Sequence, residues 1–452
     1  MRILIVSEFF APVRSIGAIR WTKLAKYLAK DHDVQIDLLT NEKEYSLDQK
    51  PSAYFFDKSA AEEVAYLNQV ITLPAPACAK AIDFIFDSAY KMLGGSNPNT
   101  EASSAANSSR LRRILSAAYK RAFSSTLSTL LAMKANSIAK SAKKIHINGS
   151  RYDAIISTSP PIWTHKIASK IKEANEGIFW IADYRDPSND MADIPKRHKG
   201  DTVETYSRDA DAVLTVWKNE PSIMRIPDTT KSVYIPNGYD PEEASRRERL
   251  PLDVFRISYT GSLVVTRDLT PLFKALTNLI DRGEIDANKI EINYAGSTSD
   301  AFQTMIDGFE TLNRKDHGFL TRKDALALQD SSAMLVICTW NTETYKTGIG
   351  GKLFELLSSS IPVAGICSGT VPDSPLKRFL STTDTGYCYE EANSEVDLKE
   401  LEAYILRCYN EWQATGTTRT DPNRDELEKF RHDRLASHIH EMIEASVSHP
   451  AE

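Results

Sequence analysis

The order of apolar and polar positions along the chain predicts alternating strands and helices. Residues 2–7 form a continuous apolar run, which is typical of a strand buried on both faces of a parallel sheet. A helical pattern follows over about 17–29, and a second strand pattern over 34–39. This strand–helix–strand opening predicts a doubly wound α/β sheet, in which ligands bind beyond the carboxyl ends of the strands.

Two series of strand patterns continue the alternation. The first series comprises 152–157, 179–182, 210–216 and 231–237. The second series comprises 255–260, 290–295, 333–339 and 363–366. A charged, turn-rich stretch separates them at 240–251, and at 452 residues the chain is too long for one ordinary core. We therefore expect one domain over 1–240, a second over 255–425, and a terminal helical segment over 426–452.

Composition narrows the class of protein. The chain is 42% hydrophobic and 26% charged, as soluble globular proteins are, and its net charge of −6 gives no reason to expect a nucleic-acid partner. The five cysteines are scattered and odd in number, which favours buried reduced thiols in a cytoplasmic protein. The sequence has no run of about 18 apolar residues, so we expect no membrane-spanning helix, and the first residues lack the layout of a signal peptide.

The stretch 346–362, KTGIGGKLFELLSSSIP, carries the clearest candidate chemistry. Its glycines precede a short helical pattern, so bare backbone N–H groups there suit a phosphate, and Lys352 adds a mobile positive charge. Glu355, one turn further on, can accept hydrogen bonds from two neighbouring hydroxyls. A phosphate beside a diol describes a nucleoside diphosphate. The alternative is a flexible glycine turn before an ordinary amphipathic helix. The stretch is not a P-loop, because Leu353 follows the lysine.

The segment GGKLFELLSSSIPV resembles the nucleotide-sugar segment of GT-B glycosyltransferases of the retaining family 4, whose pattern is K-x-x-E-x-x-x-x-G-x-P-V. The resemblance implies that Glu355 binds the donor ribose and that backbone at Gly350 and Gly351 meets the diphosphate. Many members carry a second glutamate eight positions earlier, at the donor sugar. This chain has Thr347 there, and Ser360 in place of the pattern's glycine, so the paired-glutamate motif is half present.

Two further motifs extend the resemblance at the donor side and at the domain boundary. YTGSL, residues 259–263, resembles the family's Y-x-G opening of the second domain, where Gly261 allows a backbone to approach a ligand closely. Arg267 is a candidate ligand of the diphosphate through its planar fork, or else a surface arginine. SVYIPNGYD, residues 232–240, resembles the segment that ends the family's first domain.

The resemblance also reaches the first strand–helix connection. Family members have F-x-P followed by a glycine-rich turn and an arginine, and this chain offers Phe10, Pro12, Gly17 and Arg20, with one glycine where two are common. We expect Gly17 and Arg20 on the acceptor side. Taken alone, the arginine fits a structural crossover equally well.

A third group of candidates ends two neighbouring strands of the first domain. The pattern TSPP…H…D-x-R-D resembles one branch of family 4. It implies that His165 contacts the transferred sugar or the acceptor, although a lone histidine is more often structural. Asp183, Arg185 and Asp186 form a charge cluster. We expect Arg185 and Asp186 to act in catalysis and Asp183 on the acceptor side, or the cluster to be an internal salt bridge.

An insertion at about 94–150 interrupts the first domain. Residues 94–109 are rich in Gly, Ser, Asn and Ala and predict a loop, whereas 110–144 has helical periodicity and carries basic but no acidic residues. A basic amphipathic helix can lie on an anionic membrane surface. The alternative is a solvated helix packed on its domain.

Together the resemblance implies a GT-B fold, α/β, with two doubly wound Rossmann-like domains facing a central cleft and the segment 426–452 returning to the first domain. The implied activity is retaining, metal-free transfer from a UDP- or GDP-sugar, with no other cofactor, to a hydroxyl on a glycan or lipid-linked acceptor. We expect a cytoplasmic protein, peripheral on the inner face of the cell membrane, in bacterial polysaccharide or glycolipid synthesis.

Two alternatives from other classes stay open. One is a non-catalytic GT-B-like protein that binds nucleotides as a partner, which the threonine at position 347 would allow. The other is a Rossmann oxidoreductase. The absence of G-x-G-x-x-G after the first strand argues against a dinucleotide cofactor.

Overall fold

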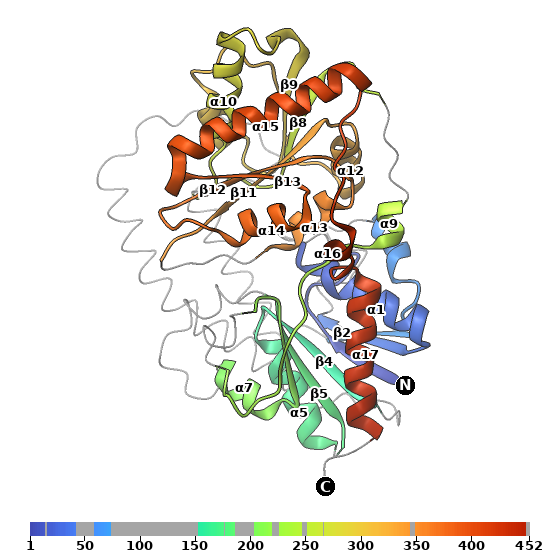
Figure 1. Ribbon diagram of the computed structural model, residues 1–452. Coiled ribbons are helices and arrows are strands. Elements are labelled where there is room, and N and C mark those ends of the chain that lie inside the picture. Colours follow the sequence, from blue (N-terminus) through green and yellow to red (C-terminus); the bar gives the residue numbers. More distant parts are fainter. Residues whose placement is uncertain are drawn as a thin grey trace, which may run out of the picture. The chain divides into compact units, whose positions relative to one another are not determined.

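A computed structural model of the chain describes residues 1–13, 16–41, 58–73, 152–175, 177–185, 203–218, 226–245, 251–264, 266–343 and 349–448. The chain divides into two compact units (Figure 1). The first unit comprises Met1–Pro236 with Ser437–Glu452, and the second comprises Asn237–Ala436. Among the expected features, the basic segment 110–144, Asp186 and Thr347 lie outside the described residues.

The first unit is built on one parallel sheet. Among the described residues, its strand order is β3-β2-β1-β4-β5-β6-β7, and every neighbouring pair is parallel. The strands are β1 (Arg2–Val6), β2 (Gln35–Asn41), β3 (Gln69–Leu73), β4 (Ala154–Ser159), β5 (Phe179–Tyr184), β6 (Ala212–Thr215) and β7 (Ser232–Tyr234). The helices are α1 (Ile16–His32), the 3₁₀ helix η1 (Lys58–Val64), α5 (Trp163–Ala174) and α7 (Val203–Asp209).

The order of this sheet reverses direction at β1. Val6 pairs with Leu39 of β2 on one side and with Ser157 of β4 on the other. The loops after β1 and β4 therefore open on the two sides of a switch point, which is where doubly wound sheets bind ligands. Leu4 and Val6 are fully buried and pack with Ile167 of α5, as the continuous apolar pattern of the first strand predicts.

The second unit repeats the architecture with a shorter sheet. Among the described residues, its strand order is β10-β9-β8-β11-β12-β13, again parallel throughout. The strands are β8 (Phe255–Thr260), β9 (Ile290–Ala295), β10 (Arg314–Asp316), β11 (Met334–Trp340), β12 (Val363–Ser368) and β13 (Gly386–Glu390). The helices are α9 (Pro241–Ser245), α10 (Thr270–Asp281), α11 (Ser299–Ile306), α12 (Arg322–Asp330), α13 (Gly351–Leu357), α14 (Pro375–Thr383), α15 (Ser394–Thr415) and α16 (Arg424–Glu428), with 3₁₀ helices η2 (Ala287–Lys289) and η3 (Glu391–Asn393).

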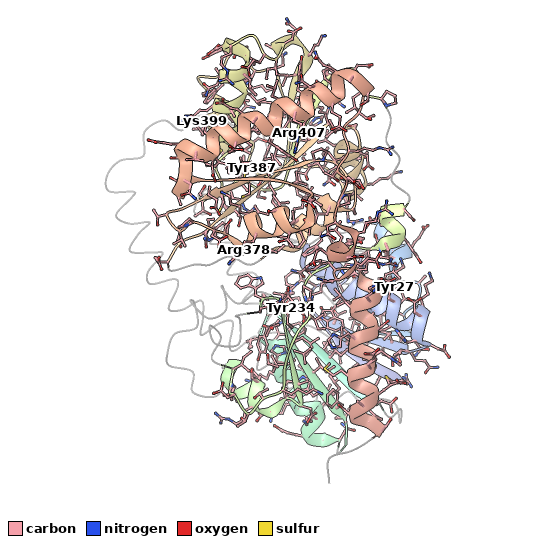
Figure 2. All side chains as sticks on the ribbon, in the orientation of Figure 1. Tyr27, Tyr234, Arg378, Tyr387, Lys399 and Arg407 are labelled. Carbon is pink, nitrogen blue, oxygen red and sulfur yellow. The ribbon has the colours of Figure 1, made fainter. Side chains whose placement is uncertain are left out.

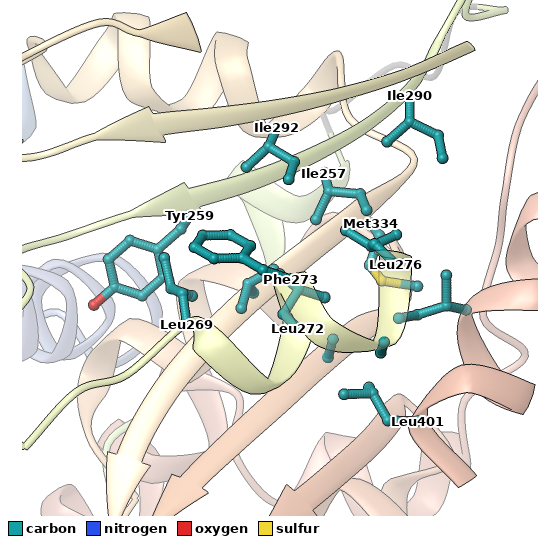
Figure 3. Packing of buried hydrophobic residues seen from close by; sticks show 14 of the residues in the cluster. Ile257, Tyr259, Leu269, Leu272, Phe273, Leu276, Ile290, Ile292, Met334 and Leu401 are labelled. Carbon is teal, nitrogen blue, oxygen red and sulfur yellow. The ribbon is translucent and has the colours of Figure 1, made fainter. Parts of the chain in front are cut away.

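Helices cover both faces of the second sheet. On one face, Ile257 and Met334 of the strands pack against Phe273 of α10 and Leu401 of α15 (Figure 3). On the other face, strand residues such as Val363 pack against α13 and α14. Successive residues of β12 alternate between these two clusters, which is the period-two pattern of a strand enclosed on both sides. The prediction of two doubly wound Rossmann-like domains is thereby confirmed.

The outer side of α15 is polar. Lys399 and Arg407 are exposed there (Figure 2), and the Arg407 guanidinium carbon lies 5.2 Å from the Tyr404 ring centroid. The long helix thus has one face in the core and one in solvent, as its mixed sequence requires. Within the described residues, no helix combines the length and apolar character needed to cross a membrane.

The C-terminal helix α17 (His432–Ser448) belongs to the first unit from Ser437 onward. Its His440 ring stacks on His32, the last residue of α1, with ring centroids 4.2 Å apart, and Ser437 Oγ lies 3.0 Å from His32 Nε2. The stretch 240–251, expected to be a linker, contains α9, whose first turn is capped by Asp240: its Oδ1 accepts from the backbone N–H of Glu242.

Candidate functional site

In the second unit, the candidate residues gather where the strands end. Gly261 follows β8 and Gly296 follows β9, and a Cβ at position 296 would overlap the carbonyl oxygen of Gly261. Glycine at 296 therefore lets the two strand-end loops approach closely. The sequence identified Gly261 from its motif, whereas Gly296 was seen only as the end of a strand.

Glu355 lies on α13, and three polar side chains contact its carboxylate. Its side chain is 10% exposed, and its Oε1 accepts hydrogen bonds from Lys352 Nζ and from Gln329 Nε2, the latter at 3.0 Å. The Arg322 Nε lies 3.7 Å from Oε2. Two cations and a buried amide therefore surround one carboxylate.

The surroundings of Glu355 keep it ionised. Burial alone would raise the pKa of this carboxyl, but the charges of Lys352 and Arg322, with the hydrogen bonds from Lys352 and Gln329, outweigh burial and bring the pKa to about 2. The side chain can therefore only accept hydrogen bonds at neutral pH, which suits the binding of hydroxyl groups.

The glycines ahead of α13 stay a predicted contact of the diphosphate. The helix begins at Gly351 after Gly350, and it is only seven residues long, so its dipole is small. A Cβ at Gly350 would meet no described atom within 4 Å, and Gly350 is exposed. Basic side chains near the strand ends add to the positive potential at the start of this helix.

Arg267 is one of those basic side chains. Its Nη1 donates to the Ser262 carbonyl oxygen at 2.8 Å, and its guanidinium carbon lies 5.9 Å from the Trp340 ring centroid. Its Nε is buried without a hydrogen-bond partner among the described residues. Because Ser262 follows β8 and Trp340 ends β11, the guanidinium lies at the switch point of the second sheet.

In the first unit, Asp183 forms the centre of a buried polar cluster. Its Oδ1 accepts from Arg20 Nη2 at 2.9 Å, and its Oδ2 accepts from Trp21 Nε1 at 2.7 Å and from Thr158 Oγ1 at 2.9 Å. Arg20 also donates to the carbonyl oxygens of Ile235 and Pro236. Arg20 is 3% exposed and Asp183 is 0% exposed, so in this structure their hydrogen bonds connect buried parts of the unit.

Arg185, two residues after Asp183, points to a different neighbour. Its guanidinium carbon lies 4.6 Å from the Phe9 ring centroid, and its Nη2 donates to the Pro160 carbonyl oxygen. A Cβ at Gly17 would overlap this guanidinium. The expected acceptor-side glycine thus makes room for the expected catalytic arginine, a pairing that the sequence did not reveal.

His165 lies in the core of the first unit. It is 0% exposed, its Nδ1 lies 2.7 Å from Ser157 Oγ, and its ring packs edge-on against Tyr184 with centroids 4.6 Å apart. Burial lowers the pKa of the imidazole to about 3, so the ring is neutral. The protein encloses the ring in this structure, and its Nε2 has no hydrogen-bond partner among the described residues. Its contact with the transferred sugar or the acceptor stays a prediction.

Metal ligands do not cluster in the part of the chain that the structure describes: no group of three or more His, Cys, Asp or Glu side chains there could hold an ion. Gln329 and Arg322, which contact Glu355, were not identified from the sequence. They lie 26 and 33 positions before it, on α12, and nothing in their local pattern distinguishes them from other helix residues.

No protein-family model matches the chain, and no curated protein matches it by sequence. Solved structures do match in fold. The α,α-trehalose 6-phosphate synthase of Burkholderia multivorans is 10% identical, with a TM-score of 0.57 over 100% of both chains. An E. coli trehalose-6-phosphate protein bound with UDP-2-fluoro glucose is 12% identical, with a TM-score of 0.55 over 98% of this chain and 99% of that one.

A third solved structure is a point mutant of S. aureus TarM in complex with fondaparinux, α-GlcNAc-glycerol and UDP. It is 9% identical, with a TM-score of 0.54 over 98% of this chain and 99% of that one. These neighbours are GT-B glycosyltransferases. The chain therefore has the GT-B fold, as the sequence predicted.

Proposed function

We propose that the chain is a retaining, metal-independent glycosyltransferase that moves a sugar from a UDP- or GDP-sugar to a hydroxyl acceptor. The observation that carries the proposal is the Glu355 carboxylate, which is buried, ionised and held near the ends of parallel strands in a GT-B fold. An ionised carboxylate with two oxygens matches the two hydroxyls of a ribose. This is also the role that the resemblance to family 4 implies for it.

Arg267 and Lys352 supply the charge that the reaction needs. As the bond to the sugar breaks, negative charge develops on the leaving diphosphate, and fixed cations stabilise it. Lys352 is 30% exposed and pairs with Glu355, and its flexible stem lets the ammonium reach a phosphate instead. Arg267 is held by Ser262 and presents a planar fork. These groups make a metal unnecessary for charge balance.

The acceptor side of the proposal rests on the first unit. Arg185 lies against Gly17 at the start of α1, and we assign this guanidinium to the acceptor or to the transferred sugar. Arg20 and Asp183 support the same strand ends from within. Asp186 is assigned to catalysis, and Thr347 is assigned to the residues that bind the donor nucleotide.

The acceptor is a glycan or a lipid-linked glycan of bacterial polysaccharide or glycolipid synthesis, reached at the inner face of the cell membrane. The basic segment 110–144 supports membrane contact by its sequence alone. Flotation with anionic vesicles tests this contact: the protein should float at low salt and be released at high salt. Protein that stays in solution at low salt argues for a solvated helix.

A screen of nucleotide sugars tests the proposal as a whole. Thermal shift should identify a nucleoside diphosphate and its sugar as ligands, and release of free nucleotide should follow when the acceptor is added. If a nucleotide sugar binds but no free nucleotide is released with any acceptor tested, the chain is better described as a non-catalytic nucleotide-binding protein. Stabilisation by NAD rather than by a nucleoside diphosphate would favour an oxidoreductase.

A further inference from the structure

Gln329 is the buried neighbour of the proposed ribose ligand. It lies near the end of α12 and is 0% exposed. Its amide nitrogen donates to Glu355 Oε1 and to Thr260 Oγ1, each at 3.0 Å. Thr260 is the last residue of β8, directly before Gly261. A single side-chain amide therefore joins the carboxylate on α13 to the end of β8.

The three groups around Glu355 differ in how firmly they are held. Lys352 is partly exposed, and the proposed function gives its ammonium a second partner in the diphosphate. Arg322 lies on the same face of α12 as Gln329, seven residues or about two turns earlier, and its Nη atoms donate to Glu243 at 2.6 and 2.9 Å. Of these three side chains, Gln329 is the one that combines full burial with a hydrogen bond to the carboxylate and a second one to Thr260.

We infer that Gln329 is a positioning residue for Glu355: its buried amide fixes the orientation of the carboxylate and thereby sets the discrimination between ribose and 2′-deoxyribose. The inference rests on the proposed function of Glu355. Two hydroxyls can both be bound only if the plane of the carboxylate matches the plane of the diol, and a terminal carboxylate rotates easily unless one oxygen is held. Binding geometry of this kind depends on the supporting contacts as much as on the ligand residue.

The first test is Gln329→Met, which keeps the length of the side chain and removes its donor. The measurement is the ratio of Kd values for the 2′-deoxy and ribose forms of UDP or GDP, whichever the wild type binds. We expect the wild type to favour the ribose form and the variant to lose that preference several-fold. A purely structural defect would weaken both forms equally and leave the ratio unchanged.

Two control variants separate positioning from general effects. Thr260→Val removes the second anchor while keeping the contact with Glu355, and it should retain most of the ratio. Gln413→Met makes the same chemical change on α15, where Gln413 donates to Tyr409 Oη, and it should leave the ratio unchanged. A loss in Thr260→Val as large as in Gln329→Met would show that the strand contact, not the carboxylate, matters.

Gln329→Glu decides the question if the methionine variant does not fold. At neutral pH it places a second carboxylate beside Glu355 and offers no donor, so discrimination should be lost. Lowering the pH from 8 to 5 should restore it, because two adjacent carboxylates share a proton and so regain a donor. No recovery, with the wild type unchanged over that range, overturns the inference.

The failure of the inference and of the proposed function are distinguishable. A wild type that binds UDP or GDP and discriminates, with an unchanged ratio in Gln329→Met, overturns the positioning role alone. If the wild type binds neither UDP nor GDP, or binds the ribose and 2′-deoxyribose forms equally, the role of Glu355 is overturned, and the positioning role of Gln329 with it.

Discussion

The Arg20 guanidinium and the Asp183 carboxylate form a buried ion pair, with Nη2 and Oδ1 2.9 Å apart, that fastens α1 to the end of β5. The two residues are 163 positions apart in the chain. Hydrogen bonds from Trp21 and Thr158 satisfy the other carboxylate oxygen, and the carbonyl oxygens of Ile235 and Pro236 accept from the arginine. The pair therefore holds the strand-end edge of the first unit together.

We expect Asp183→Asn to lower the free energy of unfolding by about 3–5 kcal/mol, because it leaves the Arg20 charge buried without its partner. Denaturant unfolding measures the change. Lys170→Ala, which removes an exposed ion pair with Glu173 in the same unit, should cost less than about 1 kcal/mol. A stable Asp183→Asn protein that has lost only transfer activity would instead place the carboxylate in contact with the acceptor.

Arg267→Ala tests the diphosphate contact. Charge-assisted hydrogen bonds to phosphate contribute about 1.5–3 kcal/mol, so the affinity for UDP or GDP should fall about ten- to hundred-fold. The affinity for the uncharged nucleoside should hardly change, and isothermal titration measures both. Arg314→Ala, an exposed arginine at the start of β10, is the matched control and should affect neither ligand. Equal losses for nucleotide and nucleoside would assign Arg267 to folding.

His165 allows a prediction about pH. Its pKa is about 3 in the folded chain, because burial disfavours the charged ring, whereas an unfolded chain binds that proton near pH 6.5. Below pH 6.5 the His165 ring is therefore protonated in the unfolded state but stays neutral in the folded state. Because of His165, the free energy of unfolding should decrease as the pH falls from about 6.5 to about 3, by at most about 1.4 kcal/mol per pH unit.

An NMR titration of the His165 ring measures this directly: the ring signals should not move between pH 8 and pH 5. Unfolding curves of His165→Gln over the same range should show a weaker acid dependence than those of the wild type. A ring that titrates near pH 6.5 would contradict the buried position and would favour a place at the surface of the site.

The fold could be predicted from the sequence because its signals are local. Each buried parallel strand is an apolar run, such as the one that contains Leu4 and Val6, and each run is followed by a helical period. Glu355 could be chosen as a candidate for the same reason, since the glycines, the lysine and the helix that surround it are contiguous. Neither prediction needed to know how distant segments meet.

The contacts of these residues could not be predicted in this way. Gln329 reaches Glu355 only because α12 and α13 pack near each other, and no periodicity encodes that meeting. Arg20 and Asp183 were both candidates, yet their pairing depends on the register of α1 against β5. For His165, the sequence showed a polar residue near a helix start, but whether that face points inward is decided by the sheet it covers.

The contacts of Glu355 predict that Glu355→Gln lowers the stability of the fold. The low pKa of the carboxyl means that its ionised form stabilises the fold, since Lys352, Arg322 and Gln329 all favour the charge. That stabilisation is present above the ordinary pKa of about 4.3 and is lost as the pH falls toward 2. At pH 7 the variant should therefore melt earlier than the wild type, and the difference should shrink in acid.

A lower melting temperature alone consequently does not identify a ribose ligand, and Glu291→Gln provides the matched control. Glu291 is a second carboxylate of the same unit with a lowered pKa: burial opposes the shift, and hydrogen bonds from Arg256 and Asn293, with the charge of Arg256, overcome it. It is the second residue of β9, at the opposite end of the strand from Gly296, so its variant should lose stability but keep nucleotide affinity. Glu355→Gln should lose both, with affinity for UDP or GDP reduced at least several-fold and the preference for ribose over 2′-deoxyribose diminished. Isothermal titration at pH 7 with both sugar forms measures these effects. If the two carboxylate variants bind both nucleotides alike, the charge of Glu355 serves the fold alone, and the donor site must lie elsewhere.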